Sequence, residues 1–157
     1  MAAPDHHELD APPWQRVEST LMATARAIRR AYEMRLARLE LNLTQASLLA
    51  FLSEAGPISQ SHLAARLEMG RAATGLVIDT LEARGLIERR ANPADRRAWL
   101  IALCPDGIQL LEPIMKIDET LRAELREGIP RPERQRLASL LERLRMNLTG
   151  VLEETAD

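Results

Sequence analysis

Residues Ser59 to Pro105 carry the sequence SQSHLAARLEMGRAATGLVIDTLEARGLIERRANPADRRAWLIALCP, and this stretch decides the fold. Within this stretch, residues recur at the i, i+3, i+4, i+7 spacing of one helix face: Thr74, Val77, Ile78 and Leu81. We expect this face to pack on a preceding short helix through three residues: Leu63, Ala64 and Leu67. The pattern predicts two helices joined by a tight turn, which is a helix-turn-helix.

The opposite face of the second helix carries Arg71, Ala72, Gly75 and Leu76. An α-helix fits the major groove of DNA, and small side chains on an exposed face allow close approach to the base edges. Gly75 costs roughly 1 kcal/mol relative to alanine inside a helix. Either helix–helix packing or close approach to a partner could offset that cost, and the sequence leaves both readings open.

A β-hairpin follows the second helix, which ends at Gly85, a residue suited to the left-handed cap position. We expect a strand over Leu86–Arg90, a turn over Ala91–Arg97 and a returning strand over Ala98–Leu103. The turn is favoured by an Asn-Pro step and an aspartate.

The turn carries two adjacent arginines, Arg96 and Arg97, which suit a phosphate backbone or a narrow minor groove. Asp95 could orient one of them through a charge-assisted pair. The alternative is that this charged turn is simply exposed to solvent. The position of the turn directly after a helix-turn-helix favours a DNA-binding role.

The segment GLIERRANPADRRAWLIALCPDG, residues 85–107, resembles the wing of the MarR family of winged-helix transcriptional regulators. The resemblance extends back through SQSHLAARLEMGRAATGLVIDTLEARG and outward over nearly the whole chain. The family's Asp-x-Arg signature falls on Asp95 and Arg97.

The resemblance implies a homodimer whose recognition helices enter successive major grooves while the wing arginine probes the minor groove. It also implies that a small, often aromatic or phenolic, effector binds between the dimer arms and the DNA-binding lobe and releases the DNA. Family recognition helices often carry Ser, Thr or Arg where this chain has Gly75 and Leu76, and Leu76 could instead touch a thymine methyl group.

The start of the first motif helix suits contacts to the DNA backbone. Ser59 is a good N-cap, and Gln60 and Ser61 fall where phosphate contacts occur in helix-turn-helix docking. The next residue, His62, could act as a pH switch or touch an effector, or it could be an ordinary, partly exposed histidine.

Composition bounds the class of protein. A chain of 157 residues with 46% apolar residues predicts one globular domain, and 3% aromatic residues means a core of aliphatic side chains. The net charge is −2, but residues 66–97 hold seven arginines and five acidic residues, an excess of two positive charges that a dimer would double. A single cysteine excludes an internal disulfide, and we find no signal sequence or membrane span, so we expect a cytoplasmic protein.

The flanking segments read as amphipathic helices around the lobe. We expect a loose tail over residues 1–12, a helical dimerisation region over residues 13–41 and 105–155, and the winged helix-turn-helix lobe over residues 42–104. Leucine-rich stripes on both arms suggest interdigitation with a second copy, although an intramolecular bundle is the alternative. The predicted fold class is therefore mostly α with a small β-wing.

Several boundaries follow from local chemistry. We expect the first long helix to run to about Leu41, Thr44 to cap the next helix, and Gly56-Pro57 to end it. A short strand at Ile58 could join the wing sheet. Pro105 should open a helix with Cys104 at its cap.

The last third of the chain is predicted to be two helices. Pro113 should kink the first of them, and Gly128-Ile129-Pro130 should end it. Pro132 and Glu133 then begin the last helix.

Three residues are candidates for effector binding: Trp14, Tyr32 and His62. The two aromatic ones could equally belong to the core or the interface. Cys104 raises the alternative of a thiol redox sensor, because helix N-termini lower thiol pKa values.

Nothing in the chain supplies a nucleophile, base and orienter at readable spacing, so we expect no catalytic residue. We also expect no cofactor or metal, because the His6-His7-Glu8 cluster on the tail lacks further ligands. The sequence predicts a homodimeric regulator, interpreted as a repressor, that binds a double-stranded operator and responds to a small effector. A winged-helix module that binds protein through Leu76 is the alternative.

Overall fold

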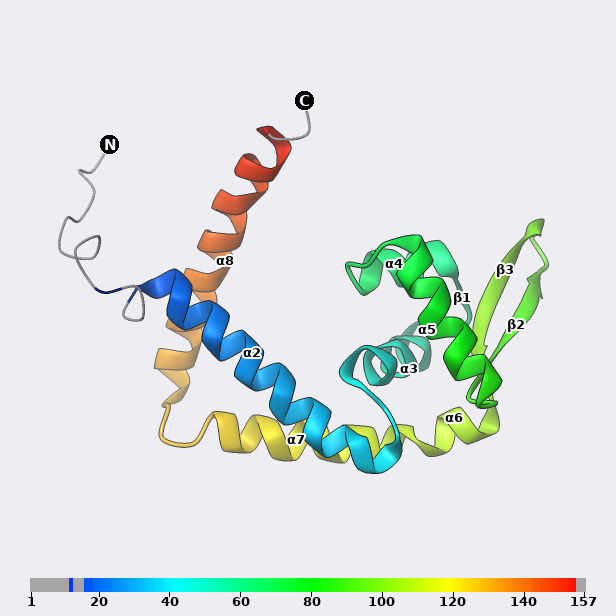
Figure 1. The fold of residues 1–157 in the computed structure, drawn as a ribbon, viewed down its shortest axis with the longest axis horizontal. Helices are drawn as coiled ribbons and strands as arrows, with labels where there is room; N and C mark the ends of the chain where they lie inside the picture. The colour runs from blue at the N-terminus through cyan, green and yellow to red at the C-terminus, as the bar shows by residue number, and fades with distance from the viewer. Residues whose placement is uncertain (1–11, 13–15, 155–157) are drawn as a thin grey trace. The chain divides into compact units, whose positions relative to one another are not determined.

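The computed structural model describes residue 12 and residues 16–154, and in this part the protein is mostly helical with one small antiparallel sheet (Figure 1). This confirms the predicted fold class. The chain divides into two compact units, residues 1–118 and residues 119–157.

Unit 1 holds the sheet and most helices, in this order: α2 (Val17–Leu36), η2 (Ala37–Leu39), α3 (Leu43–Ala55), β1 (Ile58–Ser59), α4 (Gln60–Arg66), α5 (Arg71–Ala83), β2 (Ile87–Asn92), β3 (Asp95–Leu103), α6 (Pro105–Gln109) and the first part of α7 (Leu111–Leu125). Unit 2 holds the end of α7 and the long helix α8 (Arg131–Glu154). None of the described helices is long and apolar enough to cross a membrane.

The core of unit 1 is aliphatic, as the scarcity of aromatic residues predicts. Its fully buried side chains come from the end of α2, from α3, α4 and α5 and from the sheet, and include Leu48, Leu63, Ile78, Leu81 and Ile101. The predicted inner face of α5 is confirmed, and its polar member Thr74 is satisfied by donating to the Gly70 carbonyl oxygen at 3.0 Å. One face of α5 is thus fixed to the core and the other remains outside.

The sheet has the strand order β1-β3-β2, with β3 antiparallel to both neighbours. Ile58 pairs with Ile101, which confirms the predicted short strand beside the wing. The side chain of Ser59 accepts from the main-chain N–H of His62 at 3.3 Å, so the predicted cap of α4 is also confirmed. Gly85 has φ +70°, the left-handed conformation expected after α5.

The cap of α3 was predicted wrongly. The helix begins at Leu43, and Asn42, not Thr44, is its N-cap. The side chain of Asn42 accepts from the Gln45 main-chain N–H at 2.8 Å, and the Gln45 side chain accepts from the Asn42 main-chain N–H at 3.0 Å. This reciprocal pair satisfies two N–H groups at once, which the hydroxyl of Thr44 inside the first turn does not do.

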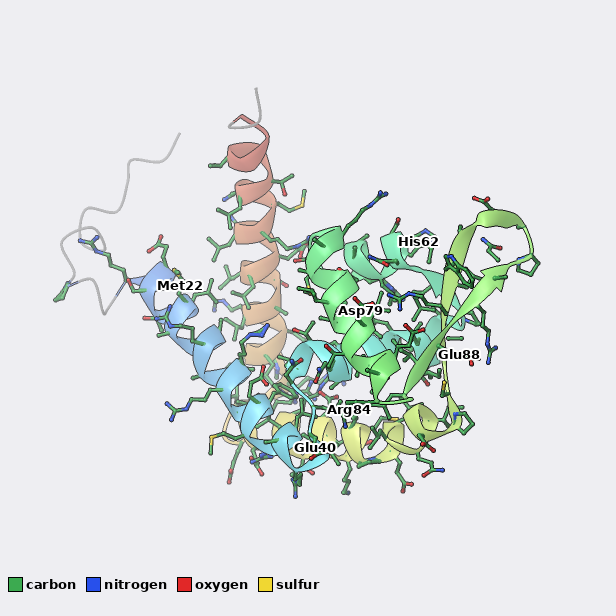
Figure 2. All side chains as sticks on the ribbon, turned by 45° about the vertical axis from the view of Figure 1, so that its right-hand side comes forward. Met22, Glu40, His62, Asp79, Arg84 and Glu88 are labelled. Atoms are coloured by element: carbon green, nitrogen blue, oxygen red, sulfur yellow. The ribbon has the colours of Figure 1, made fainter. Side chains whose placement is uncertain are left out.

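The first long helix ends earlier than expected, at Leu36, and a 3₁₀ turn follows. Glu40 then adopts φ 54°, which is costly for a residue with a side chain. Arg84 holds this corner, because its guanidinium donates to the main-chain oxygens of Glu40 at 2.5 Å and Leu39 at 3.3 Å (Figure 2). The contact joins the end of α5 to the turn between α2 and α3.

Pro113 produces a break rather than the predicted kink. Helix α6 ends at Gln109 and α7 begins at Leu111, so Pro113 lies in the first turn of a new helix. A proline cannot donate to the carbonyl four residues earlier and its ring clashes with that carbonyl, which here belongs to Gln109. Pro105 and Cys104 occupy the predicted N1 and cap positions of α6.

The hairpin has longer strands and a shorter turn than expected. Strand β2 runs to Asn92 and β3 begins at Asp95, so the loop is Pro93-Ala94 alone. The Asn92 side chain accepts from the Ala94 main-chain N–H at 3.0 Å, which closes a tight Asx turn.

The strand pairing is irregular just below this turn. Ala91 pairs with Trp99 and Asn92 pairs with Asp95, so the register shifts by several residues between them. A shift of this kind re-aims the side chains of a strand.

We predict that Asn42→Ala lowers the free energy of unfolding by about 1 kcal/mol, because it removes the side-chain oxygen that accepts from the Gln45 main-chain N–H at the α3 cap. Urea unfolding followed by circular dichroism measures this. Asn147→Ala, inside α8, is the control and should be neutral or slightly stabilising, since alanine is the better helix former. Equal losses in both variants would contradict the cap assignment.

Candidate nucleic-acid interface

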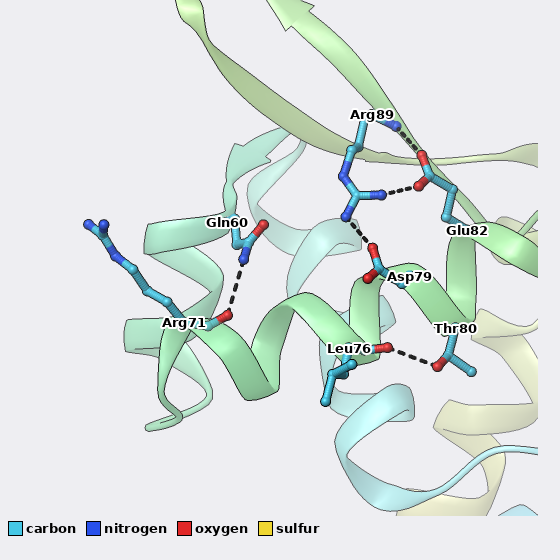
Figure 3. Close-up of polar contacts among 7 residues, drawn as sticks. All are labelled: Gln60, Arg71, Leu76, Asp79, Thr80, Glu82 and Arg89. Carbon is cyan, nitrogen blue, oxygen red and sulfur yellow. Dashed lines mark hydrogen bonds and ion pairs between the residues drawn. The ribbon is translucent and has the colours of Figure 1, made fainter.

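The outer face of α5 is exposed and almost free of bulky polar groups. Arg71 and Ala72 are exposed in its first turn, and Leu76 is 69% exposed near its middle. Thr80 lies one turn further, and its hydroxyl donates to the Leu76 carbonyl oxygen at 2.8 Å (Figure 3). The face therefore offers one cation and small or apolar surface.

Gly75 is explained in part by packing. A Cβ at this position would lie 3.2 Å from the side-chain nitrogen of Gln60, closer than most such contacts. That same amide nitrogen donates to the Arg71 carbonyl oxygen at 3.1 Å (Figure 3). Gln60, predicted to contact a phosphate, thus ties the start of α4 to the start of α5.

Two other residues predicted near the DNA backbone, Ser59 and Ser61, lie at the start of α4. Ser59 is half-buried because it caps the helix, whereas Ser61 and His62 are exposed. Gln60 joins this group to Arg71. The structure thus brings the α4 residues and the first turn of α5 together.

Arg89 on β2 forms a double ion pair with α5 that sequence reasoning missed. Its guanidinium contacts Asp79 at 2.5 Å and also Glu82, and its main-chain N–H donates to Glu82 at 3.2 Å (Figure 3). The hydrogen bond to Asp79 raises the pKa of Arg89, with the charge of Glu82 adding to it against partial burial. The available signal was the spacing of Asp79 and Glu82, which puts two acids on one side of a helix.

Most arginines of residues 66–97 whose side chains are described are paired with other groups of the protein. Arg84 lies 3.9 Å from the Glu40 carboxylate, and Arg90 lies 2.5 Å from that of Glu88. Arg66 lies over the Phe51 ring at 5.2 Å. Within the described part of the chain, Arg71 is left without a carboxylate partner, so it is the cation that α5 presents outward.

The wing arginines are placed by their backbone alone. Arg96 and Arg97 belong to β3, in the irregular part of its pairing with β2, and their side chains lie outside the described residues. Asp95 is exposed and pairs with Asn92 at the turn. The predicted loop position of all three is therefore corrected to the beginning of a strand, because the Asx turn needs only two residues.

The predicted effector residues do not converge on one site in the described part of the chain. Trp14 lies outside the described residues, as does the His6-His7-Glu8 cluster. Tyr32 packs against the core, and its hydroxyl donates to the Asp118 carboxylate at 2.7 Å. His62 is exposed on α4, and no contact among the described residues joins it to Tyr32.

Cys104 does not have the lowered pKa that a helix N-terminus was expected to give. Burial, and after it the negative charge of Glu88, raise the pKa of this thiol. A reactive thiol needs the opposite shift, since the thiolate is the nucleophile. The electrostatic basis for a redox sensor at this position is therefore wrong.

We predict that Arg89→Ala lowers the free energy of unfolding by about 1–2 kcal/mol, because the pair is only partly exposed and two carboxylates lose their partner. Arg90→Ala is the matched control on the same strand. Its ion pair is about half exposed, so the loss should stay within about 0.5 kcal/mol. Chemical denaturation measures the free energy of unfolding of both variants. Equal losses of this free energy in the two variants would contradict the role of Arg89.

Comparison with known proteins matches this architecture. The sequence model of the MarR family matches residues 41–99, from the start of α3 into the wing. The chain is 31% identical to the multiple antibiotic resistance protein MarR of Salmonella typhimurium over 69% of its own length and 76% of that protein. It is 32% identical to an uncharacterized HTH-type transcriptional regulator, YdgJ of Bacillus subtilis, over 66% of its own length, and it spans 63% of that relative.

Solved structures agree. That of Bordetella bronchiseptica BpsR, whose DNA binding is described as regulated by 6-hydroxynicotinic acid, matches with a TM-score of 0.76 and 25% identity, covering 83% of this chain and 94% of BpsR. The helix-turn-helix, the wing and these relatives lead to one conclusion: the chain belongs to the MarR family of transcriptional regulators, which bind DNA and are not enzymes.

Proposed function

We propose that this protein is a dimeric repressor that binds a pseudo-palindromic DNA operator and releases it when a small aromatic molecule binds. The observation that carries the proposal is the outer face of α5. Arg71 points to solvent there without a carboxylate partner among the described residues, while Arg89 of β2 pairs with Asp79 and Glu82 of α5 and offsets part of their negative charge. Such a face suits the negatively charged major groove.

In this proposal the first two turns of α5 enter the major groove. Arg71 contacts a guanine edge or a phosphate, while Ala72 and Gly75 allow the helix backbone to come close. Leu76 contacts a thymine methyl group, an apolar form of base readout. The exposure of these residues supports the assignment.

The DNA backbone is held on both sides of the recognition helix. Ser59, Gln60 and Ser61 contact phosphates, and Gln60 also fixes the Arg71 main chain through its hydrogen bond. Arg97, with Arg96 and Asp95, reaches the minor groove beside the site. The tight turn after β2 supports this role, since it makes the hairpin narrow at its end.

The apolar surface of α8 supports dimerisation. Residues of α8 recur with alternating steps of four and three: Leu137, Leu141, Leu144, Leu148 and Val151. Leu137, Leu148 and Val151 are each more than half exposed. A heptad stripe of this kind requires a partner helix, and we assign it to a second copy. In such a dimer the recognition helices meet half-sites about 10 bp apart, one turn of DNA.

The proposed effector is a small aromatic molecule. The neighbour BpsR is described as regulated by 6-hydroxynicotinic acid, an aromatic hydroxy acid. Tyr32 and Asp118 form a part-buried polar pair on α2 and α7, where the predicted dimerisation region adjoins the lobe. An effector bound near this pair would shift the population of DNA-competent dimers by its differential affinity for the two states.

A protein-binding winged helix is the second candidate, favoured by one observation: Leu76 is 69% exposed in the middle of α5. If the protein-binding function holds, Leu76→Asp abolishes the capture of a protein partner from nuclease-treated extract. If the regulator proposal holds, the same change abolishes DNA binding in a purified system.

We predict that Arg97→Ala weakens binding to duplex DNA from the promoter beside the gene and lowers the slope of log K against log salt by about 1, because one positive charge that displaces a counterion from the DNA is lost. Fluorescence anisotropy across a salt series measures both quantities. Arg126→Ala is the control, since this exposed arginine follows α7 in the other unit. An unchanged slope in Arg97→Ala would remove the wing from the interface.

We predict that Leu148→Asp converts the protein to a monomer, because a charge in the α8 stripe must be buried in the dimer. Light scattering after size exclusion measures the mass, and DNA affinity should fall with it. Ser139→Asp, on the opposite side of α8, should leave the dimer intact. A dimer that survives Leu148→Asp would favour an intramolecular role for this helix.

A further inference from the structure

Trp99 is an exposed indole in a chain that contains only four aromatic side chains. It lies on β3 and is 58% exposed. It is not part of the hydrophobic core formed by the described residues, and its cross-strand partner Ala91 is exposed as well. A large apolar group left in water on an otherwise charged hairpin suggests a partner.

The pairing of β2 with β3 shows which side of the hairpin carries Trp99. Residues two apart on a strand share a face, so Trp99 lies on the face of Ile101, and the cross-strand partner of Ile101 is Arg89. Arg89 reaches from this face to Asp79 and Glu82 (Figure 3). Trp99 therefore lies on the side of the hairpin that faces α5, nearer the turn, where it is no longer covered.

The same residue adjoins the start of α4. Leu100 pairs with Ser59, so the next residue of β3 toward the turn, Trp99, lies beside the first residue of α4, Gln60. Gln60 in turn holds the Arg71 carbonyl at 3.1 Å. Trp99 thus lies in the strand next to the start of α4, which Gln60 joins to the start of α5.

The charge around Trp99 indicates the kind of partner. Arg96 and Arg97 precede it on β3, with one alanine between Arg97 and Trp99. Burial of these arginines against an apolar protein surface would cost desolvation energy, whereas a polyanion is attracted by them. A strand of DNA offers both a phosphate for the arginines and an apolar sugar for the ring.

We propose that Trp99 packs its indole on a deoxyribose of the operator and donates its N–H to the adjacent phosphate, between the recognition helix and the wing. The indole has a single donor and no acceptor, which matches a phosphate oxygen. The contact positions the protein on the duplex and reads no base, because sugar and phosphate carry no direct sequence information. It rests on the proposed function and adds to it a contact that carries no charge.

The first test compares affinities for the promoter duplex and for a random duplex of equal length. Trp99→Ala should weaken binding to both by about tenfold, near the lower end of losses for aromatic contacts to nucleic acid. The salt slope should stay unchanged, since a neutral side chain displaces no counterion. Trp99→Phe should fall between wild type and Trp99→Ala, because it keeps the ring surface and loses the donor.

Leu76→Ala is the matched comparison, since it should weaken promoter binding and leave random-duplex binding unchanged. Unaltered affinity of correctly folded Trp99→Ala for both duplexes, beside a wild type that binds with a steep salt slope, would overturn the inference alone. A wild type that binds neither duplex would overturn the proposed function together with it. A loss confined to the promoter duplex would make Trp99 a base-reading residue and contradict its positioning role.

The second test uses Trp14→Phe, which leaves Trp99 as the only tryptophan. Its fluorescence should be quenched when either duplex is added and stay constant when the protein is concentrated without DNA. A spectral change on concentration alone would show that the indole contacts a second copy, which would overturn the inference.

Discussion

The distance between the recognition helix and the wing depends on one side chain. Arg89 extends from β2 and pairs with both Asp79 and Glu82 of α5, while its own main-chain N–H also donates to Glu82. A two-stranded hairpin standing out from a three-stranded sheet has little packing of its own, so a charge-assisted contact at its base fixes its direction. Any ligand that touches helix and wing together meets a spacing set by this cluster.

The ion pairs of this cluster help to explain how a chain with a net charge of −2 can present a surface that binds DNA. Of the arginines between residues 66 and 97, those at positions 84, 89 and 90 are engaged with acids or main-chain oxygens inside the lobe. They offset most of the negative charge of the acids beside them, which would otherwise repel a phosphate. Attraction of DNA then depends on the few cations that remain, Arg71 first among the described ones, and net charge is a poor guide to such a surface.

Besides its charges, the protein exposes apolar side chains on several elements. The core is closed by leucine and isoleucine, yet α8 keeps a heptad stripe in the open, α5 exposes Leu76 and the wing exposes Trp99. Each lies on an element that also carries arginines. Exposed apolar surface of this kind marks sites that a partner covers, and in the proposed complex these partners are a second copy for α8 and DNA for α5 and the wing.

The sequence by itself determined the elements that depend on local chemistry. The helical period of Thr74, Ile78 and Leu81, the glycine after α5 and the proline before α6 each act within a few residues, so their signals can be read directly. They were enough to give the fold class and the winged helix-turn-helix, and to select the outer face of α5 as the candidate site.

The tertiary structure decided what depends on partners distant in the chain. Arg84 donates a hydrogen bond to the main chain of Glu40, forty-four residues earlier. Arg89 forms ion pairs with two acidic residues of the neighbouring helix α5. The register shift below the wing turn is also set by the sheet, and it moved Arg96 and Arg97 from the predicted loop into a strand. Such pairings depend on which surfaces packing brings together, and a charged residue in a sequence does not specify its partner.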